Sequence, residues 1–223
     1  MIAGVLLAAG ASRRMGRPKP LVRERGESFL THGVRHLWVA CDRVVVVLGA
    51  GADRVRSEVE REFVRLTARG ALHGELRQAR RHGAAGLEVR FHVNASWRSG
   101  MYSSVRAGLR EALRFKPEAV LVLPVDHPAI RPRTVEDLAS LMRAALRAHR
   151  EPQARARFAY GLIPRHRRRR GHPIALTPAL ARAIARDVGA HDLSDAIRRN
   201  AALLGYLDVP DPGIVRNRNR PGD

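Results

Sequence analysis

The chain contains little cysteine, lysine or aromatic residue, and each shortage narrows the classes of protein to which it can belong. Among its 223 residues Cys41 is the one cysteine, which excludes an internal disulfide and a cysteine-based metal cluster. Aromatic residues make up 4% of the chain, so platforms for stacking single-stranded nucleic acid are scarce. No apolar run approaches the roughly 18 residues of a membrane helix, and no basic segment typical of a secretion signal precedes the first apolar run. We therefore expect a soluble, cytoplasmic protein.

The formal net charge of +20 favours a nucleic-acid partner at first sight. However, the excess is almost entirely arginine, since Lys19 and Lys116 are the two lysines of the chain. The arginines are scattered over every expected helix instead of being gathered on one, which is typical of a compositional bias. Nucleic-acid binding is therefore disfavoured and is kept as an alternative from a different class of function.

Apolar runs alternate with amphipathic segments along most of the chain. This order predicts the α/β class with a three-layer, doubly wound, mostly parallel sheet, formed by a single domain over 1–223. The expected strands are 1–9, 43–48, 88–93, 119–125, 158–164, 174–177 and 203–209. The expected helices are 29–40 with Ser28 as its cap, one starting near Asp53, one starting at Ser103 or Ser104 and running to 115, 132–150, 178–186 and 192–200. We expect a loose helix and a loop over 65–88, a charged connector over 151–157 and a polar tail over 211–223.

The segment after the first expected strand has the composition of a phosphate-binding loop. The apolar run Val5 to Ala9 is followed by the small residues Gly10, Ala11 and Ser12, and Gly10 can adopt a positive φ. Four cations then follow within one loop: Arg13, Arg14, Arg17 and Lys19. Backbone N–H groups and cationic side chains that converge in this way can bind one anion. The alternative is a basic surface turn, which explains the cations but not the small residues before them.

Residues 7–19 also carry a family signature, Leu-Ala-Ala-Gly-x-Ser-x-Arg-Met-Gly-x-Pro-Lys. This pattern resembles the N-terminal motif of the MobA-like NTP transferase family, and most closely its cytidylyltransferase branch, because the guanylyl branch usually has a second glycine at Ala9. The resemblance implies a Rossmann-like nucleotide-diphospho-sugar transferase fold. It also implies that the nucleotide contacts Leu7, Ala8, Ala9, Gly10, Ser12, Arg14 and Lys19, and that Arg14 and Lys19 act in catalysis.

Two positions resemble the metal-binding residues of the family. Asp126 ends an apolar strand and is followed by His127 and Pro128, and a carboxylate at the carboxyl end of a parallel strand can hold Mg²⁺ together with substrate phosphates. The alternative for Asp126 is a helix cap. A second oxygen ligand is expected from Asn219, in preference to Asn217, in the motif near the end of the chain. That motif departs from the family at Arg220 and Gly222, and its alternative is a polar tail without a metal.

Two further matches concern the substrates. The Gly-Met-x-x-Ser pattern at 100–104 resembles the loop that binds the base and ribose, and it implies roles for Ser103 and Ser104. A serine helix cap is the ordinary alternative. Gly171, His172 and Pro173 resemble an acceptor-binding element of the cytidylyl branch. The cationic run 165–170 before them either attracts an anionic acceptor or forms a solvated loop.

Together the motifs imply an Mg-dependent nucleotidyltransferase. It would transfer a nucleoside monophosphate, CMP in preference to GMP, from an NTP to a phosphorylated acceptor such as molybdopterin, and release pyrophosphate. Mg²⁺ is the expected cofactor, with Mn²⁺ as the alternative, and CTP is favoured over GTP. A molybdoenzyme or its chaperone is a candidate protein partner. The alternative within the same fold is transfer to a sugar phosphate or another small phosphorylated acceptor.

Overall fold

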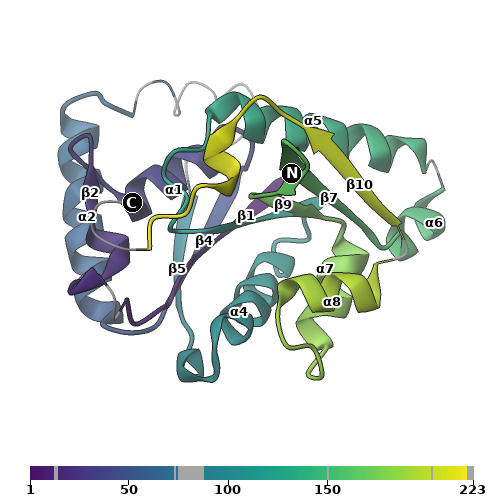
Figure 1. Cartoon of the computed structure of the whole chain (residues 1–223), viewed down its shortest axis with the longest axis horizontal. Coiled ribbons are helices and arrows are strands. Elements are labelled where there is room, and N and C mark those ends of the chain that lie inside the picture. Colours follow the sequence, from purple (N-terminus) through teal and green to yellow (C-terminus); the bar gives the residue numbers. More distant parts are fainter. Residues whose placement is uncertain (13–14, 73, 75–87, 150, 202, 220–223) are drawn as a thin grey trace.

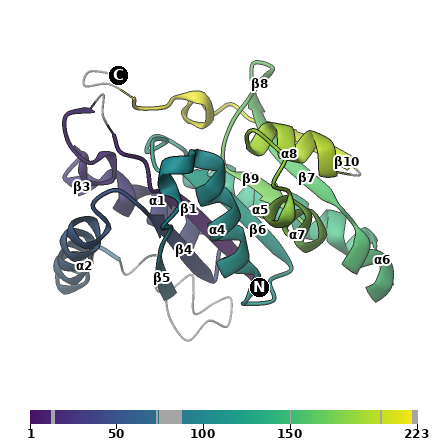
Figure 2. The same ribbon diagram turned by 90° about the horizontal axis from the view of Figure 1, so that it is seen from below.

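The computed structural model describes residues 1–12, 15–72, 74, 88–149, 151–201 and 203–219. Its centre is a mostly parallel sheet with the strand order β10-β7-β9-β6-β1-β4-β5, and β8 pairs with β7 outside this order. Helices cover both faces of the sheet, as Figures 1 and 2 show from two directions. The α/β, doubly wound, mostly parallel fold expected from the sequence is therefore confirmed.

The strands are β1 (Ile2–Ala8), β2 (Arg23–Glu24), β3 (Glu27–Ser28), β4 (Arg43–Leu48), β5 (Glu88–Val93), β6 (Ala119–Pro124), β7 (Tyr160–His166), β8 (Arg169–Arg170), β9 (Ile174–Leu176) and β10 (Leu203–Asp208). The α-helices are α1 (Phe29–Trp38), α2 (Ala52–Ala68), α4 (Met101–Leu113), α5 (Pro132–Ala148), α6 (Pro152–Arg157), α7 (Pro178–Arg186) and α8 (Leu193–Asn200). Short 3₁₀ helices are η2 (Lys19–Leu21), η3 (Trp97–Ser99) and η4 (Pro212–Val215).

Strand β1 lies between β6 and β4, parallel to both, and all seven of its residues are buried. Successive side chains of a strand point to opposite faces, so β1 contributes to two cores. Ile2 and Leu6 belong to the core that includes residues of α1, α2 and α5, whereas Val5 and Leu7 belong to the core that includes residues of α4, α7 and α8. A strand buried on both faces carries an unbroken apolar run, which is why its sequence shows no polar alternation.

Capping residues account for several helix starts. Ser28 accepts a hydrogen bond from the Thr31 amide at 3.1 Å and begins α1, as expected. The serine cap expected for α4 is wrong: the cap is Gly100, with φ of 102°, so the helix begins at Met101 and both serines lie inside its first turn. A φ of 102° strongly favours glycine, which explains the earlier start.

Three connecting segments are more ordered than expected. Residues 152–157 form α6 instead of a connector, and η4 lies within the expected polar tail. The expected cationic loop is a β-hairpin in which β8 pairs with β7 and the turn residues Arg167 and Arg168 have φ of 48° and 65°. Most of the expected loop over 65–88 lies outside the described residues.

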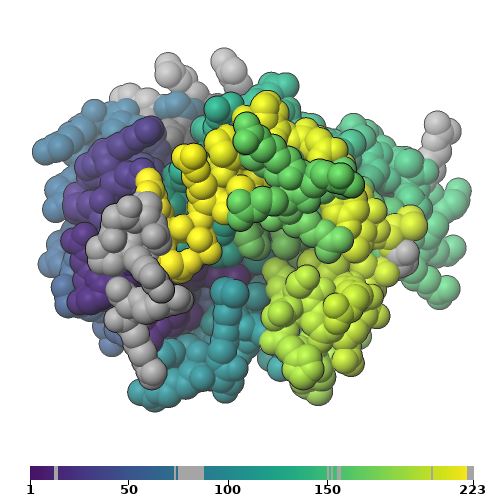
Figure 3. Space-filling view, in the orientation of Figure 1, coloured from purple at the N-terminus to yellow at the C-terminus, as the bar shows by residue number. Residues whose placement is uncertain are grey.

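The parallel strands place their carboxyl ends along one edge of the sheet. The segments after β1, β4 and β6 meet at this edge, and the chain after η4 returns to it, because the Arg218 amide donates to the Asp126 carbonyl at 2.8 Å. In the space-filling view of this side, the C-terminal segment (yellow) lies between N-terminal residues (purple) and the β7–β8 region (green) (Figure 3). Ligands of open α/β sheets bind at such an edge.

Candidate active site

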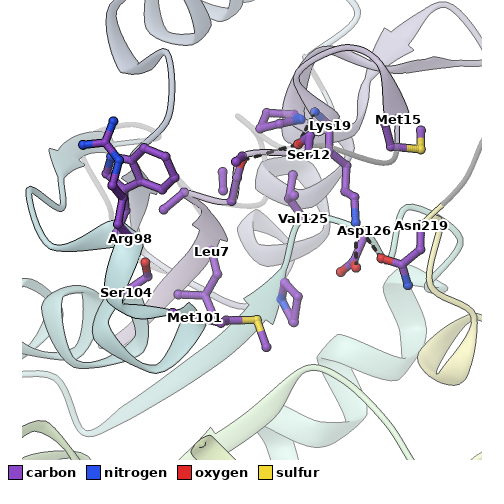
Figure 4. Close-up of a pocket in the computed structure, with 18 residues that line it drawn as sticks. Leu7, Ser12, Met15, Lys19, Arg98, Met101, Ser104, Val125, Asp126 and Asn219 are labelled. Atoms are coloured by element: carbon purple, nitrogen blue, oxygen red, sulfur yellow. Dashed lines mark hydrogen bonds and ion pairs between the residues drawn. The ribbon is translucent and has the colours of Figure 1, made fainter.

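A cavity of about 490 Å³ opens at the carboxyl ends of β1 and β6. Nine of the residues expected at the site line it: Leu7, Ala8, Ala9, Gly10, Ser12, Lys19, Ser104, Asp126 and Asn219. They come from five separate parts of the chain, and Figure 4 shows the cavity with its lining side chains.

The loop after β1 is held in shape by Ser12. Its hydroxyl accepts a hydrogen bond from the Lys19 amide at 2.7 Å, and its carbonyl accepts one from the Met15 amide at 2.9 Å. Among the described residues of this loop, Ser12 and Gly16 have positive φ, at 53° and 66°, and Gly10 does not. Gly10 instead borders open space, with no atom within 4 Å of the position of an added Cβ. The loop therefore leaves room for a ligand to approach its backbone closely.

Lys19 joins the two oxygens expected to bind a metal. Its ammonium nitrogen lies 3.2 Å from Asp126 Oδ2 and donates to Asn219 Oδ1 at 2.7 Å (Figure 4). The Lys19 and Asp126 side chains are 16% and 19% exposed, so this ion pair is less screened by solvent than a surface pair. Residues distant in the sequence thus form one cluster of a cation and two hard oxygen ligands.

The N-terminus of α4 forms the opposite wall of the cavity. Gly100, Met101 and Ser104 line it, and the first-turn amides of a helix are available to a ligand. Asn94 positions both serines, because its amide nitrogen lies 2.9 Å from Ser103 Oγ and 3.0 Å from Ser104 Oγ. Ser103 does not line the cavity; its hydroxyl also donates within the loop, to the carbonyls of Ser96 and Gly100.

Trp97 and Arg98 also line this wall, and neither was expected from the sequence. The Arg98 guanidinium lies 4.8 Å from the centre of the Trp97 ring. Gly49 allows Trp97 to approach, since a Cβ there would lie 2.7 Å from Trp97 Cβ and 2.5 Å from the Ala9 carbonyl oxygen. A tryptophan in a polar loop just before a helix is the signal that could have indicated this contribution.

The expected acceptor residues lie behind Asp126 and outside the set that lines the cavity. The His172 amide donates to the Ile214 carbonyl at 3.0 Å, and a Cβ on Gly171 would lie 2.5 Å from that carbonyl oxygen. The His172 ring packs against the His127 ring at 5.0 Å, and the peptide to Pro173 is cis. Gly171 to Pro173 therefore support η4 and the segment that leads to Asn219.

Burial disfavours the protonated form of both histidines behind Asp126. Burial, and to a lesser extent the neighbouring His127, lower the pKa of His172 to about 3, although Asp126 opposes the change. Burial is also the main cause that lowers the pKa of His127, although Asp126 raises it. Within the described residues, the buried Nδ1 atoms of both rings have no hydrogen-bond partner.

Some expected residues are placed differently or lie outside the described part. Arg14 falls outside the described residues, as do Arg220 and Gly222. Arg165 is paired with Asp208 at 2.7 Å, and the guanidinium groups of Arg165 and Arg170 both stack on Tyr206. Part of the cationic run is therefore engaged in the fold.

The oxygens at Asp126 and Asn219 fit a divalent metal with hard-ligand preference. Both already contact one cation, and Mg²⁺ usually needs only one or two protein oxygens because substrate phosphates and water supply the rest. Within the described residues, no group of three or more His, Cys, Asp or Glu side chains is placed to hold a metal without such help.

The sequence of residues 4–203 matches the model of the MobA-like NTP transferase domain. The chain belongs to the MobA-like NTP transferase family. Nicotine blue oxidoreductase of Paenarthrobacter nicotinovorans is 32% identical over 217 residues, which cover 94% of this chain and 88% of that protein. A probable molybdenum cofactor guanylyltransferase of Opitutus terrae is 31% identical over 132 residues, which cover 54% of this chain and 65% of that protein.

The fold of this MobA-like chain also occurs in solved structures. A nucleotidyl transferase from Methanothermobacter thermautotrophicus has a TM-score of 0.66 and 21% identity, and the likeness covers 99% of this chain and 92% of that one. Membership of this family makes the chain a nucleotidyltransferase of the MobA-like type. The relatives named above include both a transferase and an oxidoreductase. Among the described helices, none has both the length and the apolar composition of a membrane span.

Proposed function

We propose that the protein transfers a nucleoside monophosphate from an NTP to a small phosphorylated acceptor and releases pyrophosphate. The observation that carries the proposal is the meeting of Lys19, Asp126 and Asn219 in one cavity with the small-residue loop after β1. This arrangement combines a small-residue loop suited to phosphate, a lysine ammonium and two side-chain oxygens suited to a metal, which are components that phosphoryl transfer uses.

In this reaction an oxygen of the acceptor phosphate attacks the α-phosphorus of the NTP. A new P–O bond forms and the bond between the α-phosphorus and the leaving pyrophosphate breaks. The loop from Gly10 to Ser12 would bind the triphosphate through its backbone, and Lys19 would neutralise charge on the leaving group. Asp126 and Asn219 would hold the metal, which when bound neutralises phosphate charge. No general base is required, because a phosphate nucleophile is already ionised.

We propose CTP as the preferred donor and a molybdopterin-type phosphate as the acceptor. The support for CTP is Ala9, which lines the cavity at the position where the guanylyl branch usually has glycine. The support for the acceptor is the kinship to a probable molybdenum cofactor guanylyltransferase. Gly171 to Pro173 would then bind the acceptor after a rearrangement beside Asp126. A molybdoenzyme or its chaperone would receive the product.

The test is release of pyrophosphate from CTP, GTP, ATP and UTP, each with Mg²⁺ or Mn²⁺ and with molybdopterin as acceptor. We expect CTP to be used best, and Lys19→Ala and Asp126→Ala to lower turnover by about 100-fold or more while the protein stays folded. Lys116→Ala, at the other lysine, should leave turnover unchanged because Lys116 is exposed after α4, away from the cavity. Full turnover in both cavity variants would disprove these residue roles.

A second candidate function is oxidoreduction, which the 32% identity to nicotine blue oxidoreductase favours. In this candidate reaction a reduced nicotinamide dinucleotide in the same cavity would pass a hydride to the dye. The dye would take up one proton from water, and the oxidised dinucleotide would leave. Oxidation of NADH or NADPH in the presence of nicotine blue, without NTP or metal, would support this candidate. Pyrophosphate release without such oxidation would exclude it in favour of nucleotidyl transfer.

A further inference from the structure

The Lys19 ammonium contacts the same two side-chain oxygens that a metal ion would need. Asp126 Oδ2 is 3.2 Å and Asn219 Oδ1 is 2.7 Å from the ammonium nitrogen. The neighbouring cation Arg218 points elsewhere, since its guanidinium pairs with Glu24 at 3.3 Å. Among the residues that the structure describes, Lys19 is thus the side chain that pairs with the Asp126 carboxylate at its Oδ2 atom.

We infer that Lys19 occupies the metal position in the nucleotide-free protein, so that a divalent metal binds there well only after a triphosphate has drawn the ammonium away. The inference rests on the proposed function, because it assigns the same oxygens to metal. It adds an order of binding: the nucleotide binds first or together with the metal, whereas the metal alone binds weakly.

The local geometry allows Lys19 to have two positions. Its backbone is fixed, because its amide donates to Ser12 Oγ at 2.7 Å. Its flexible side chain can still swing within the cavity, which extends from Asp126 and Asn219 to the loop from Gly10 to Ser12. The fixed backbone therefore keeps the ammonium within reach of either ligand set, the oxygens or a bound triphosphate.

Electrostatics makes the two cations compete. A monovalent ammonium and a divalent metal at the same pair of oxygens repel each other, and the partial burial of Lys19 and Asp126 limits screening by solvent. A triphosphate removes the competition because it offers the ammonium a stronger anionic partner. Binding of nucleotide and of metal is then coupled, and the coupling is reciprocal.

The experiment measures binding of Mn²⁺ alone to the nucleotide-free protein, by the loss of the free Mn²⁺ signal in electron paramagnetic resonance. Lys19→Met keeps the length of the side chain and removes its charge. We expect this variant to bind Mn²⁺ at least about tenfold more tightly than the unaltered protein. Lys19→Gln should give the same direction of change, so the test does not depend on one variant folding. Lys116→Met is the matched control and should bind like the unaltered protein.

Adding Asp126→Asn to the Lys19→Met variant should abolish the gain, which locates the tighter site. Equal or weaker Mn²⁺ binding in both Lys19 variants would overturn the inference, and so would a gain that survives Asp126→Asn. Pyrophosphate release by the unaltered protein is measured separately. Activity together with no gain in Mn²⁺ binding refutes the competition alone, whereas a gain in Mn²⁺ binding without any activity refutes the proposed transfer alone.

Discussion

Asp211 is a buried residue that links the C-terminal part of the site to the rest of the fold. The residue is 2% exposed, and its carboxylate accepts three hydrogen bonds. Oδ2 receives the Arg131 amide at 2.9 Å and the Thr134 hydroxyl at 2.7 Å, and Oδ1 receives the Gly213 amide at 2.9 Å. The carboxylate thereby joins the start of α5 to η4, after which the chain continues to Asn219.

The size of the effect follows from these contacts. A hydrogen bond to a charged group contributes about 1.5–3 kcal/mol, and a buried donor left without a partner costs about 1–3 kcal/mol. Asp211→Ala removes all three acceptor contacts, so we expect a loss of about 5 kcal/mol, a large part of the roughly 5–15 kcal/mol by which a domain is stable. In Asp211→Asn the amide oxygen can still accept from the Gly213 amide, and the Thr134 hydroxyl can rotate to accept a hydrogen bond from the new NH₂ group. The Arg131 amide then faces that NH₂ group, which is a donor, and loses its acceptor. We expect that variant to lose about 2 kcal/mol.

The measurement is urea unfolding followed by tryptophan fluorescence and by circular dichroism, with coincident transitions as the condition for deriving a free energy. Asp137→Asn is the control, because Asp137 is an exposed partner of Arg133 and its loss should cost less than about 1 kcal/mol. Asp211→Asn should also lower pyrophosphate release, since Asn219 would lose its fixed position. A loss of under about 1 kcal/mol in Asp211→Ala would refute the reasoning.

Two other variants test the packing around the site. Burial lowers the pKa of His36 to about 4 from 6.5, aided by His32 and Arg35 and opposed by Asp211. Between these two pH values the unfolded chain binds more protons than the folded chain. The contribution of His36 to the free energy of unfolding is therefore fully present above about pH 6.5, and it falls by roughly 3 kcal/mol as the pH drops to about 4. His36→Phe should flatten that part of a plot of unfolding free energy against pH, and an unchanged slope would contradict the assignment. Gly108→Ala places a Cβ 2.5 Å from Val5 Cγ1 on the sheet, so urea unfolding should show a loss of about 1–3 kcal/mol, and no loss would mean that α4 moves freely.

Much of the fold could be predicted because its strands and helices carry strong local patterns. The valine run of β4 and the capped, amphipathic α1 were located at or within two residues of their bounds. The misplaced start of α4 has a local cause, because a glycine cap is a weaker signal than the serines after it. The sequence did not predict helix α6 because its six residues, Pro-Gln-Ala-Arg-Ala-Arg, show no apolar periodicity.

The sequence predicted only those residues of the site that belong to recognisable motifs. The small-residue loop, Lys19 and Asp126 stand in recognisable patterns, and they lie around one cavity. No such pattern includes Asn94, Trp97 and Arg98. They contribute to the site because Gly49 lets the loop that carries them approach the end of β1. Likewise, His172 belongs to a motif, yet its ring packs behind Asp126 instead of lining the cavity.

The sequence alone determined the α/β class, the family and the residues that can bind phosphate or metal, because these follow from local periodicity and from ordered motifs. Only the tertiary structure decided which of those residues meet. Lys19, Asp126 and Asn219 are far apart in the chain, and they converge because parallel strands bring their carboxyl ends to one edge and Asp211 holds the returning segment there. Contacts of this kind depend on the register of the whole sheet, which no local stretch of sequence encodes.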